Sequence, residues 1–184
     1  MKVFASDYDG TLYKNQVITD YDLRQIRKLR AAGHKFGIVT GRTINSIVFE
    51  INKHNIPVDF IVGINGGVVL RNDFKELFSS RMDVSVIPEL MTTLHHLDVL
   101  YYGVNDGYRM GRVHVTKEDD ETEFNIELTP VEELMQSGVR ALYVRCHDRE
   151  HAKQVADTIN ELYYEEGVKA YPNNWSVDIG VRGV

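Results

Sequence analysis

The chain has 184 residues, enough for one large domain or two small ones, and its 43% hydrophobic and 26% charged residues are typical of a globular protein. Its 21 basic and 27 acidic side chains give a formal net charge of −6, and with no basic stripe this disfavours nucleic-acid binding. No apolar run could span a bilayer, no signal peptide is evident, and one cysteine excludes an intrachain disulfide framework. We therefore expect a cytoplasmic protein with no nucleic-acid or membrane partner.

Two aspartates follow the first apolar run of the chain. The run from Val3 to Ala5 is short and partly β-branched, which predicts a buried strand. Asp7 and Asp9 stand where that strand ends, and ligands bind at strand ends in open α/β sheets. Because side chains alternate along extended backbone, both carboxylates can project to one side with Tyr8 turned away. Their mutual repulsion is relieved by a proton on one carboxyl group or by a cation between them.

A proton on one carboxyl group and a cation between the two would each be chemically useful. A carboxylate such as that of Asp7 is a ready nucleophile, and an acid such as Asp9 can protonate a leaving alkoxide and later deprotonate water. A Mg²⁺ ion on the pair would leave coordination sites for water and a substrate phosphate. Gly10 permits a tight turn and the close approach of the backbone to an anion. The alternative is a surface turn with two solvated acids, which the position directly after a strand disfavours.

A helix and a second strand come next. Thr19 or Asp20 can cap a helix that reaches Ala32, and Gly33 ends it. Residues 34–39 then predict a strand. A strand, a helix and a strand joined by short links indicate a βαβ unit within a parallel sheet.

A second polar motif, Thr40-Gly41-Arg42, stands where this strand ends and a helix over residues 44–55 begins. A hydroxyl, a glycine and the free N–H groups of a helix start form an anion site. Threonine is also a common helix cap, and the motif taken alone favours a cap. Next to the two aspartates, at a neighbouring strand end, the same motif favours phosphate binding.

A third apolar run, residues 59–64, precedes Asn65-Gly66-Gly67 and a further apolar run over residues 68–70. Asn-Gly between two apolar runs is a strong signal for a β-hairpin, so the structural interpretation of these glycines comes first.

The pattern changes from about residue 79. The acidic segment 117–123 is interpreted as a solvated loop rather than a metal site. The order of elements predicts an α+β sandwich inserted after a Rossmann-like half. The expected elements are a helix over 84–97, strands over 99–104 and 108–115, a helix from 130 to 137, a strand over 139–146, a helix from Asp148 to about 166, and strands over 168–171 and 175–181.

The stretch Asp7-Tyr8-Asp9-Gly10-Thr11-Leu12 resembles the first signature of the haloacid dehalogenase (HAD) superfamily, D-x-D-G-T-L. The resemblance implies an aspartyl-phosphate intermediate on Asp7 and a general acid/base role for Asp9. It also implies Mg²⁺ held by Asp7 and by the backbone carbonyl of Asp9.

Two later motifs are similar to those of the Cof-like branch of this superfamily. Thr40-Gly41-Arg42 matches its T-G-R, which implies a hydrogen bond from Thr40 to the transferring phosphoryl group. Asn65-Gly66-Gly67 is similar to its N-G-A, with Gly67 as a small departure, and implies that Asn65 lies near the substrate.

The resemblance implies an α/β fold with two parts. Residues 1–78 would be the N-terminal part of a HAD-like Rossmannoid core, and residues 79–184 an α+β cap of type IIB that selects the leaving group. The family pattern continues with a third-signature lysine, which would be expected about where this sequence ends at Val184. A fourth signature, G-D-x-x-N-D, follows in the family and does not occur in this sequence. We therefore expect an incomplete core with little or no activity. Its first strand would become an uncovered edge that favours self-association.

The sequence thus predicts a Mg²⁺-dependent phosphatase acting on a small phosphorylated metabolite such as a sugar phosphate. A phosphosugar mutase relative is a variant of this hypothesis. The alternative from another class is a non-catalytic binding or oligomerising protein that has kept half of the site. A dinucleotide-binding oxidoreductase is disfavoured because acids follow the first strand where a G-x-G-x-x-G loop would be needed.

Overall fold

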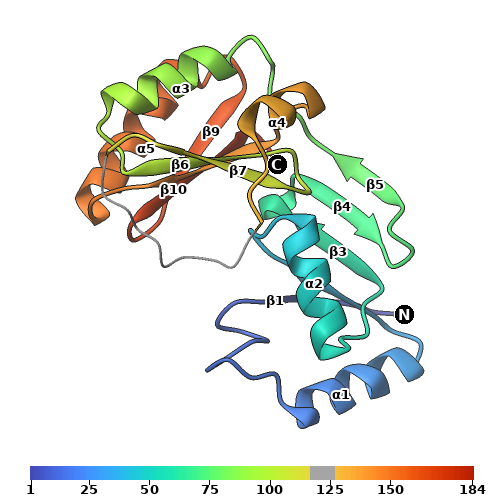
Figure 1. Cartoon of the computed structure of the whole chain (residues 1–184). Coiled ribbons are helices and arrows are strands. Elements are labelled where there is room, and N and C mark those ends of the chain that lie inside the picture. The colour runs from blue at the N-terminus through green and yellow to red at the C-terminus, as the bar shows by residue number, and fades with distance from the viewer. Residues whose placement is uncertain (117–126) are drawn as a thin grey trace. The chain divides into compact units, whose positions relative to one another are not determined.

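The computed structural model describes residues 1–116 and 127–184, which form two compact units, Met1–Ser79 and Ser80–Val184 (Figure 1). Each unit has a five-stranded sheet of its own. The acidic segment interpreted above as a solvated loop lies outside the described residues. No helix within the described ranges is both long and apolar enough to cross a membrane.

The first unit is a βαβαβ run followed by two antiparallel strands. Its sheet has the order β1-β2-β3-β4-β5, in which β1, β2 and β3 are parallel and β4 and β5 are antiparallel additions. This arrangement confirms the predicted α/β, Rossmann-like fold. The elements are β1 (Val3–Asp7), α1 (Asp20–Ala31), β2 (Lys35–Val39), α2 (Ile44–His54), β3 (Phe60–Gly63), the 3-10 turn η1 (Ile64–Gly66), β4 (Val68–Arg71) and β5 (Glu76–Ser79).

Local signals set the helix ends of this unit. Thr19 is the N-cap of α1, and its side chain accepts a hydrogen bond from the N–H of Asp22 at 3.1 Å. Thr43 precedes α2 without a side-chain capping bond. Asn55 ends α2 in the left-handed conformation, with a φ of 52°.

The strand β1 forms one edge of the sheet, and among the described strands its partner is β2. Val3 is 64% exposed and Phe4 is 40% exposed. The prediction of a buried first strand is therefore wrong, whereas the prediction of an uncovered edge strand is confirmed. An apolar run indicates a preference for extended backbone, but it does not indicate how many strands will flank the resulting strand and cover it.

The second unit is an antiparallel sheet with a core built on one face. Its strand order is β7-β6-β8-β10-β9. Buried side chains of the helices α3 and α5 join alternate strand residues such as Tyr102 and Val144 in one apolar cluster. The elements are α3 (Ile87–His96), β6 (Tyr101–Asn105), β7 (Met110–His114), α4 (Val131–Ser137), β8 (Ala141–Arg145), α5 (Arg149–Tyr163), β9 (Val168–Pro172) and β10 (Ser176–Val181).

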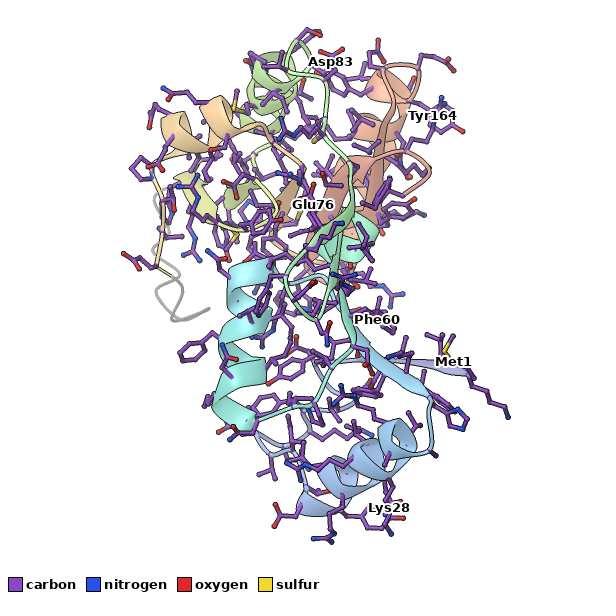
Figure 2. All side chains as sticks on the ribbon, turned by 90° about the vertical axis from the view of Figure 1, so that its right-hand side faces the viewer. Met1, Lys28, Phe60, Glu76, Asp83 and Tyr164 are labelled. Carbon is purple, nitrogen blue, oxygen red and sulfur yellow. The ribbon has the colours of Figure 1, made fainter. Side chains whose placement is uncertain are left out.

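Most ends of these elements agree with the sequence within two residues, whereas the start of α3 and the end of α5 each differ by three. Asp148 caps α5 as predicted, and its side chain accepts the N–H of His151 at 2.8 Å. The helix predicted to start near Asp83 begins only at Ile87. Asp83, labelled in Figure 2, instead accepts hydrogen bonds from the backbone and hydroxyl of Ser85. Local side-chain bonding of this kind competes with helix formation.

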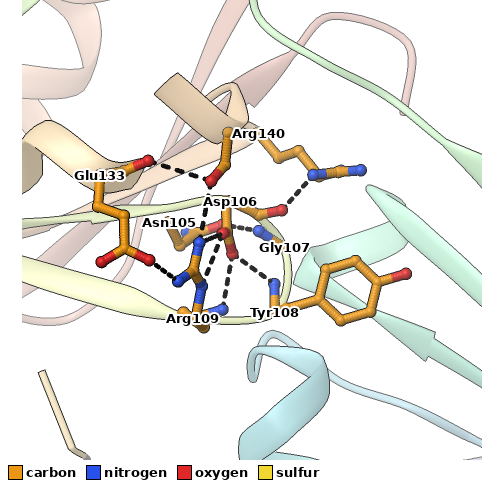
Figure 3. A network of polar contacts seen from close by, with 8 residues as sticks. Asn105, Asp106, Gly107, Tyr108, Arg109, Glu133 and Arg140 are labelled. Atoms are coloured by element: carbon orange, nitrogen blue, oxygen red, sulfur yellow. Dashed lines mark hydrogen bonds and ion pairs between the residues drawn. The ribbon is translucent and has the colours of Figure 1, made fainter. Parts of the chain in front are cut away.

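A buried polar network holds the turn between β6 and β7 (Figure 3). The carboxylate of Asp106 accepts the N–H groups of Tyr108 and Arg109, and the guanidinium of Arg109 at 2.8 and 3.0 Å. Arg109 also reaches Glu133 on α4, and Arg140 donates to the backbone carbonyl of Asp106. Burial alone would raise the pKa of Asp106, but these hydrogen bonds outweigh it and lower that pKa below its ordinary value.

This network predicts a pH-dependent stability for the second unit. Because the pKa of Asp106 is lower in the folded state, its stabilisation is present at neutral pH and lost as the pH falls below about 4. Asp106→Asn should lower the free energy of unfolding by about 1–3 kcal/mol at pH 7. Urea unfolding followed by the fluorescence of Trp175, the single tryptophan, measures this. Equal stabilities at pH 7 would contradict the prediction.

Candidate active site

The first unit brings Asp7 and Thr40 to adjacent strand ends. In the parallel pair β1–β2, Asp7 is the register partner of Val39, the last residue of β2. Thr40 follows directly, and its N–H donates to the carbonyl of Val62 on β3 at 2.9 Å. The two polar motifs found in the sequence therefore meet at the carboxyl edge of one sheet, where open α/β sheets bind ligands.

The residues after β1 fold into a tight loop that fixes Asp7. Gly10 has a φ of 78°, a left-handed conformation that favours glycine, and its N–H donates to the carbonyl of Tyr13 at 2.9 Å. The N–H of Tyr13 returns a hydrogen bond to the carbonyl of Tyr8 at 2.8 Å. Thr11 donates its hydroxyl to Oδ2 of Asp7 at 2.8 Å. Within the described ranges, Oδ1 of Asp7 and the backbone carbonyl of Asp9 accept no hydrogen bond.

Asp9 is held by an arginine of the second motif. Its two carboxylate oxygens accept the Nε and Nη2 protons of Arg42 at 2.8 and 2.7 Å, a bidentate pair. These bonds raise the pKa of Arg42 above its ordinary value. The Asp9 side chain is 51% exposed and therefore open to solvent on its other side. The sequence predicts Arg42 as a substrate-binding residue, and in the structure its charge is directed at Asp9.

Tyr8, between the two aspartates, points away from them. It is fully buried, and its hydroxyl donates to Oε2 of Glu50 on α2 at 2.9 Å. Burial together with the adjacent Glu50 raises the pKa of Tyr8 well above its ordinary value. The alternation predicted along the extended backbone thus leaves two exposed acids above one buried phenol.

Thr40, Gly41 and Asn65 lie together. Thr40 is buried, and its hydroxyl oxygen accepts the N–H of Arg42 at 3.2 Å. The N–H of Asn65 donates to the carbonyl of Thr40 at 3.1 Å. A Cβ atom added to Gly41 would lie 3.0 Å from Oδ1 of Asn65, so the Asn65 side chain stands directly beside the second motif. The threonine that precedes the helix start is Thr43, which leaves Thr40 free of a capping role.

The turn that carries Asn65 is conformationally strained. Ile64 and Asn65 have φ values of 53° and 51°, and a left-handed β-branched residue is unusual. Such residues cost on the order of 1–3 kcal/mol each and cluster at functional sites. Hydrogen bonds from Ile64 to the carbonyl of Arg42 and from Asn65 to Thr40 hold the turn against the second motif. The predicted hairpin is present, since β3 and β4 pair antiparallel across it.

Two residues that contribute to the candidate site were not identified as such from the sequence. Thr11 was noted only as part of the first motif, although its hydroxyl fixes Asp7. Glu50 was not noted at all. Its signal is positional, because Glu50 comes three residues after Ile47 and His54 four residues after Glu50, so all three share one flank of α2.

The first unit offers oxygen atoms as possible metal ligands but no cluster of acidic side chains. Among the described residues, no group of three or more His, Cys, Asp or Glu side chains is arranged to hold a metal ion. Oδ1 of Asp7 and the backbone carbonyl of Asp9 accept no hydrogen bond from the described residues, and both are oxygen atoms of the kind that bind hard cations.

Comparison with known proteins agrees with this geometry. A family model described as haloacid dehalogenase-like hydrolase matches residues 4–184. No curated protein sequence matches significantly. A phosphatase of the haloalkanoate (HAD) superfamily from Bacteroides thetaiotaomicron has a similar structure, with a TM-score of 0.78, 19% identity and coverage of 100% of this chain and 68% of that chain.

Two further solved structures share the fold. A haloacid dehalogenase-like hydrolase from Bacteroides thetaiotaomicron gives a TM-score of 0.78 at 14% identity, covering 100% of this chain and 71% of that one. A sugar phosphatase of HAD subclass IIB gives a TM-score of 0.69 at 19% identity, with coverages of 99% and 70%. The match over nearly the whole sequence shows that the chain belongs to the haloacid dehalogenase-like hydrolase family.

Proposed function

We propose that this protein is a Mg²⁺-dependent phosphatase that hydrolyses a small phosphorylated metabolite, such as a sugar phosphate, through an aspartyl-phosphate on Asp7. The observation that carries the proposal is the meeting of Asp7 and Thr40 at adjacent strand ends in a member of this hydrolase family. A sugar phosphatase among the structures of the same fold supports the choice of substrate class.

We assign each side chain a role that is compatible with the geometry. Thr11 holds Oδ2 of Asp7, which directs the other oxygen, Oδ1, toward the phosphorus as nucleophile. In its protonated form, Asp9 gives a proton to the departing alkoxide, and the resulting carboxylate then takes one from the water that hydrolyses the aspartyl-phosphate. The hydroxyl oxygen of Thr40 accepts the N–H of Arg42, which leaves its own proton available to donate to a phosphoryl oxygen. Asn65 borders the same anion site.

The available oxygens fit a Mg²⁺ ion. Asp7 would provide a carboxylate and Asp9 a carbonyl, and Mg²⁺ usually takes one or two carboxylates and completes its shell with water and substrate phosphate. When bound, the ion would neutralise phosphoryl charge as a Lewis acid.

The remaining assignments follow from this role. We assign residues 1–78 to the catalytic core and residues 79–184 to the cap that selects the substrate. The exposed edge β1 offers a route for self-association. A small phosphorylated metabolite is the only ligand besides Mg²⁺ that the proposal requires, and we place the protein in the cytoplasm.

Replacing the acid/base residue gives a specific test. Asp9→Asn should lower kcat/KM for an alkyl phosphate such as glycerol phosphate by about 10²–10⁴-fold, because an alkoxide needs a proton to leave. The loss should be smaller for p-nitrophenyl phosphate, whose leaving group is a weak base. Asp157→Asn, which alters an exposed acid on α5, is the control and should leave both rates unchanged. If neither this chain nor one extended past Val184 hydrolyses either ester with Mg²⁺, the proposed function is wrong.

A further inference from the structure

Glu50 lies at the centre of a cluster of charged and aromatic side chains behind the active site. Its side chain is only 14% exposed. Its carboxylate accepts the hydroxyl proton of Tyr8 at 2.9 Å and lies 3.3 Å from Nε2 of His54. Nη1 of Arg42 and Nζ of Lys53 are each 3.9 Å away. A carboxylate is costly to bury unless it is paired, and the Tyr8 hydrogen bond with the nearby basic side chains offsets that cost for Glu50.

The same arginine connects Glu50 to the predicted acid/base residue. One side of the Arg42 guanidinium is bound to both oxygens of Asp9, and the other side points toward Ser46 and Glu50. Its carbon lies 5.0 Å from the centre of the Tyr8 ring, at cation–π distance. The Arg42 guanidinium therefore lies over the ring of Tyr8 and also faces the carboxylate of Glu50.

The ring of Tyr8 also contacts other aromatic side chains. The ring of Tyr8 stacks on that of Tyr13 with a centroid distance of 5.3 Å and an angle of 5°. Tyr13 in turn meets the ring of His54 at 5.5 Å. Glu50 thus accepts a hydrogen bond from the hydroxyl of Tyr8 and also faces Arg42. Tyr8 is the chain neighbour of Asp9, and Arg42 is hydrogen-bonded to the Asp9 side chain.

We propose that Glu50 is a positioning residue for Asp9 and acts through Arg42 and Tyr8. The inference rests on the proposed function, in which Asp9 protonates the leaving group. Among the described residues, the bidentate arginine is the group that restrains the exposed carboxylate of Asp9. Without Glu50, Arg42 loses the carboxylate that faces its Nη1 and Asp9 loses part of the restraint on its orientation for proton transfer.

The test is a comparison of two leaving groups. Glu50→Gln keeps the shape of the side chain and an acceptor for Tyr8 but removes the charge that faces Arg42. We expect kcat/KM for glycerol phosphate to fall roughly tenfold more than kcat/KM for p-nitrophenyl phosphate. A purely structural role would lower the fraction of active protein and reduce both values equally, which would overturn the inference. Asp20→Asn, an exposed charge removal on α1 of the first unit, is the control and should change neither.

A second readout does not depend on turnover. In ¹⁵N-labelled protein, the Nε–H signal of Arg42, assigned with Arg42→Lys, should be protected from solvent exchange, and Glu50→Gln should shift it and speed its exchange. An unchanged signal would overturn the inference. If the signal responds while neither this chain nor the extended one has phosphatase activity, the anchoring is supported and the proposed function alone fails. Should Glu50→Gln not fold, Tyr8→Phe removes the hydroxyl that Glu50 holds and should act in the same direction, with a smaller effect.

Discussion

Replacing Asp7 by asparagine is expected to abolish the Mg²⁺-dependent hydrolysis of phosphate esters, with a loss of roughly 10⁴–10⁶-fold in kcat. An amide is too weak a nucleophile to attack phosphorus and cannot form an aspartyl-phosphate. Its oxygen can still accept the Thr11 hydroxyl, so the loop after β1 should keep its structure. Steady-state kinetics with p-nitrophenyl phosphate and with glycerol phosphate measure the effect.

This loss should differ in kind from that of Asp9→Asn. Removal of the nucleophile should be equally severe for both esters, because each must form the same covalent intermediate. Removal of the acid should be selective for the alkyl ester. Circular dichroism should confirm that each variant is folded. An Asp7→Asn protein that keeps a tenth or more of its activity would exclude a covalent role for Asp7.

The largest effect on stability is expected at Asp59, just before β3. Its side chain is 11% exposed and accepts Nε and Nη2 of Arg30 on α1 at 2.9 and 3.2 Å. It also accepts Nζ of Lys35 at 3.3 Å and the N–H of Phe36 at 3.0 Å, both on β2. Through this carboxylate, the start of β3 is tied to the first helix and the second strand. The hydrogen bond from Arg30, with the others, lowers the pKa of Asp59 well below its ordinary value.

Asp59→Asn should therefore lower the free energy of unfolding of the first unit by about 2–3 kcal/mol at pH 7. Because the pKa of Asp59 is lower in the folded than in the unfolded state, the stabilisation is complete above the unfolded value of about 4 and is lost as the pH falls below it. The difference between the two proteins should shrink accordingly in acid. Hydrogen exchange of the β2 and β3 amides measures it, with second-unit peptides as an internal reference.

A matched control lies in the hairpin between β4 and β5. Asp73 also pairs with an arginine, Arg71, but both side chains are about half exposed. An exposed ion pair contributes little, because solvent screens it. Asp73→Asn should consequently change the exchange rates far less than Asp59→Asn. Similar effects of the two substitutions would show that burial does not set the contribution of Asp59.

Much of the fold could be predicted because its signals are local. Thr19 and Asp148 cap their helices through their own side chains, and Asn55 ends α2 in a conformation that asparagine tolerates. The Asn65-Gly66 pair marks the connection between β3 and β4. Parallel strands with short connections then bring Asp7 and Thr40 to the same edge, which follows from topology alone.

The features that could not be predicted depend on partners distant in the sequence. The strand β5 exists because it pairs with β4, and its four residues lack an alternating pattern that would indicate it. The exposure of Val3 follows from its position on an edge strand. The clamp of Arg42 on Asp9 joins residues 33 positions apart, and the contact of Tyr8 with Glu50 spans 42. Motif spacing indicates which residues share a site, but not which of them contact one another.

The most direct measurement is the identification of the phosphorylated residue. The protein would be mixed with Mg²⁺ and a phosphate ester, quenched within a turnover, reduced with borohydride to trap any acyl phosphate, and mapped by peptide mass spectrometry. The account predicts a modified residue at Asp7, absent from Asp7→Asn and retained in Asp157→Asn. Hydrolysis that proceeds with no modified residue, or with the phosphoryl group on another side chain, would contradict it.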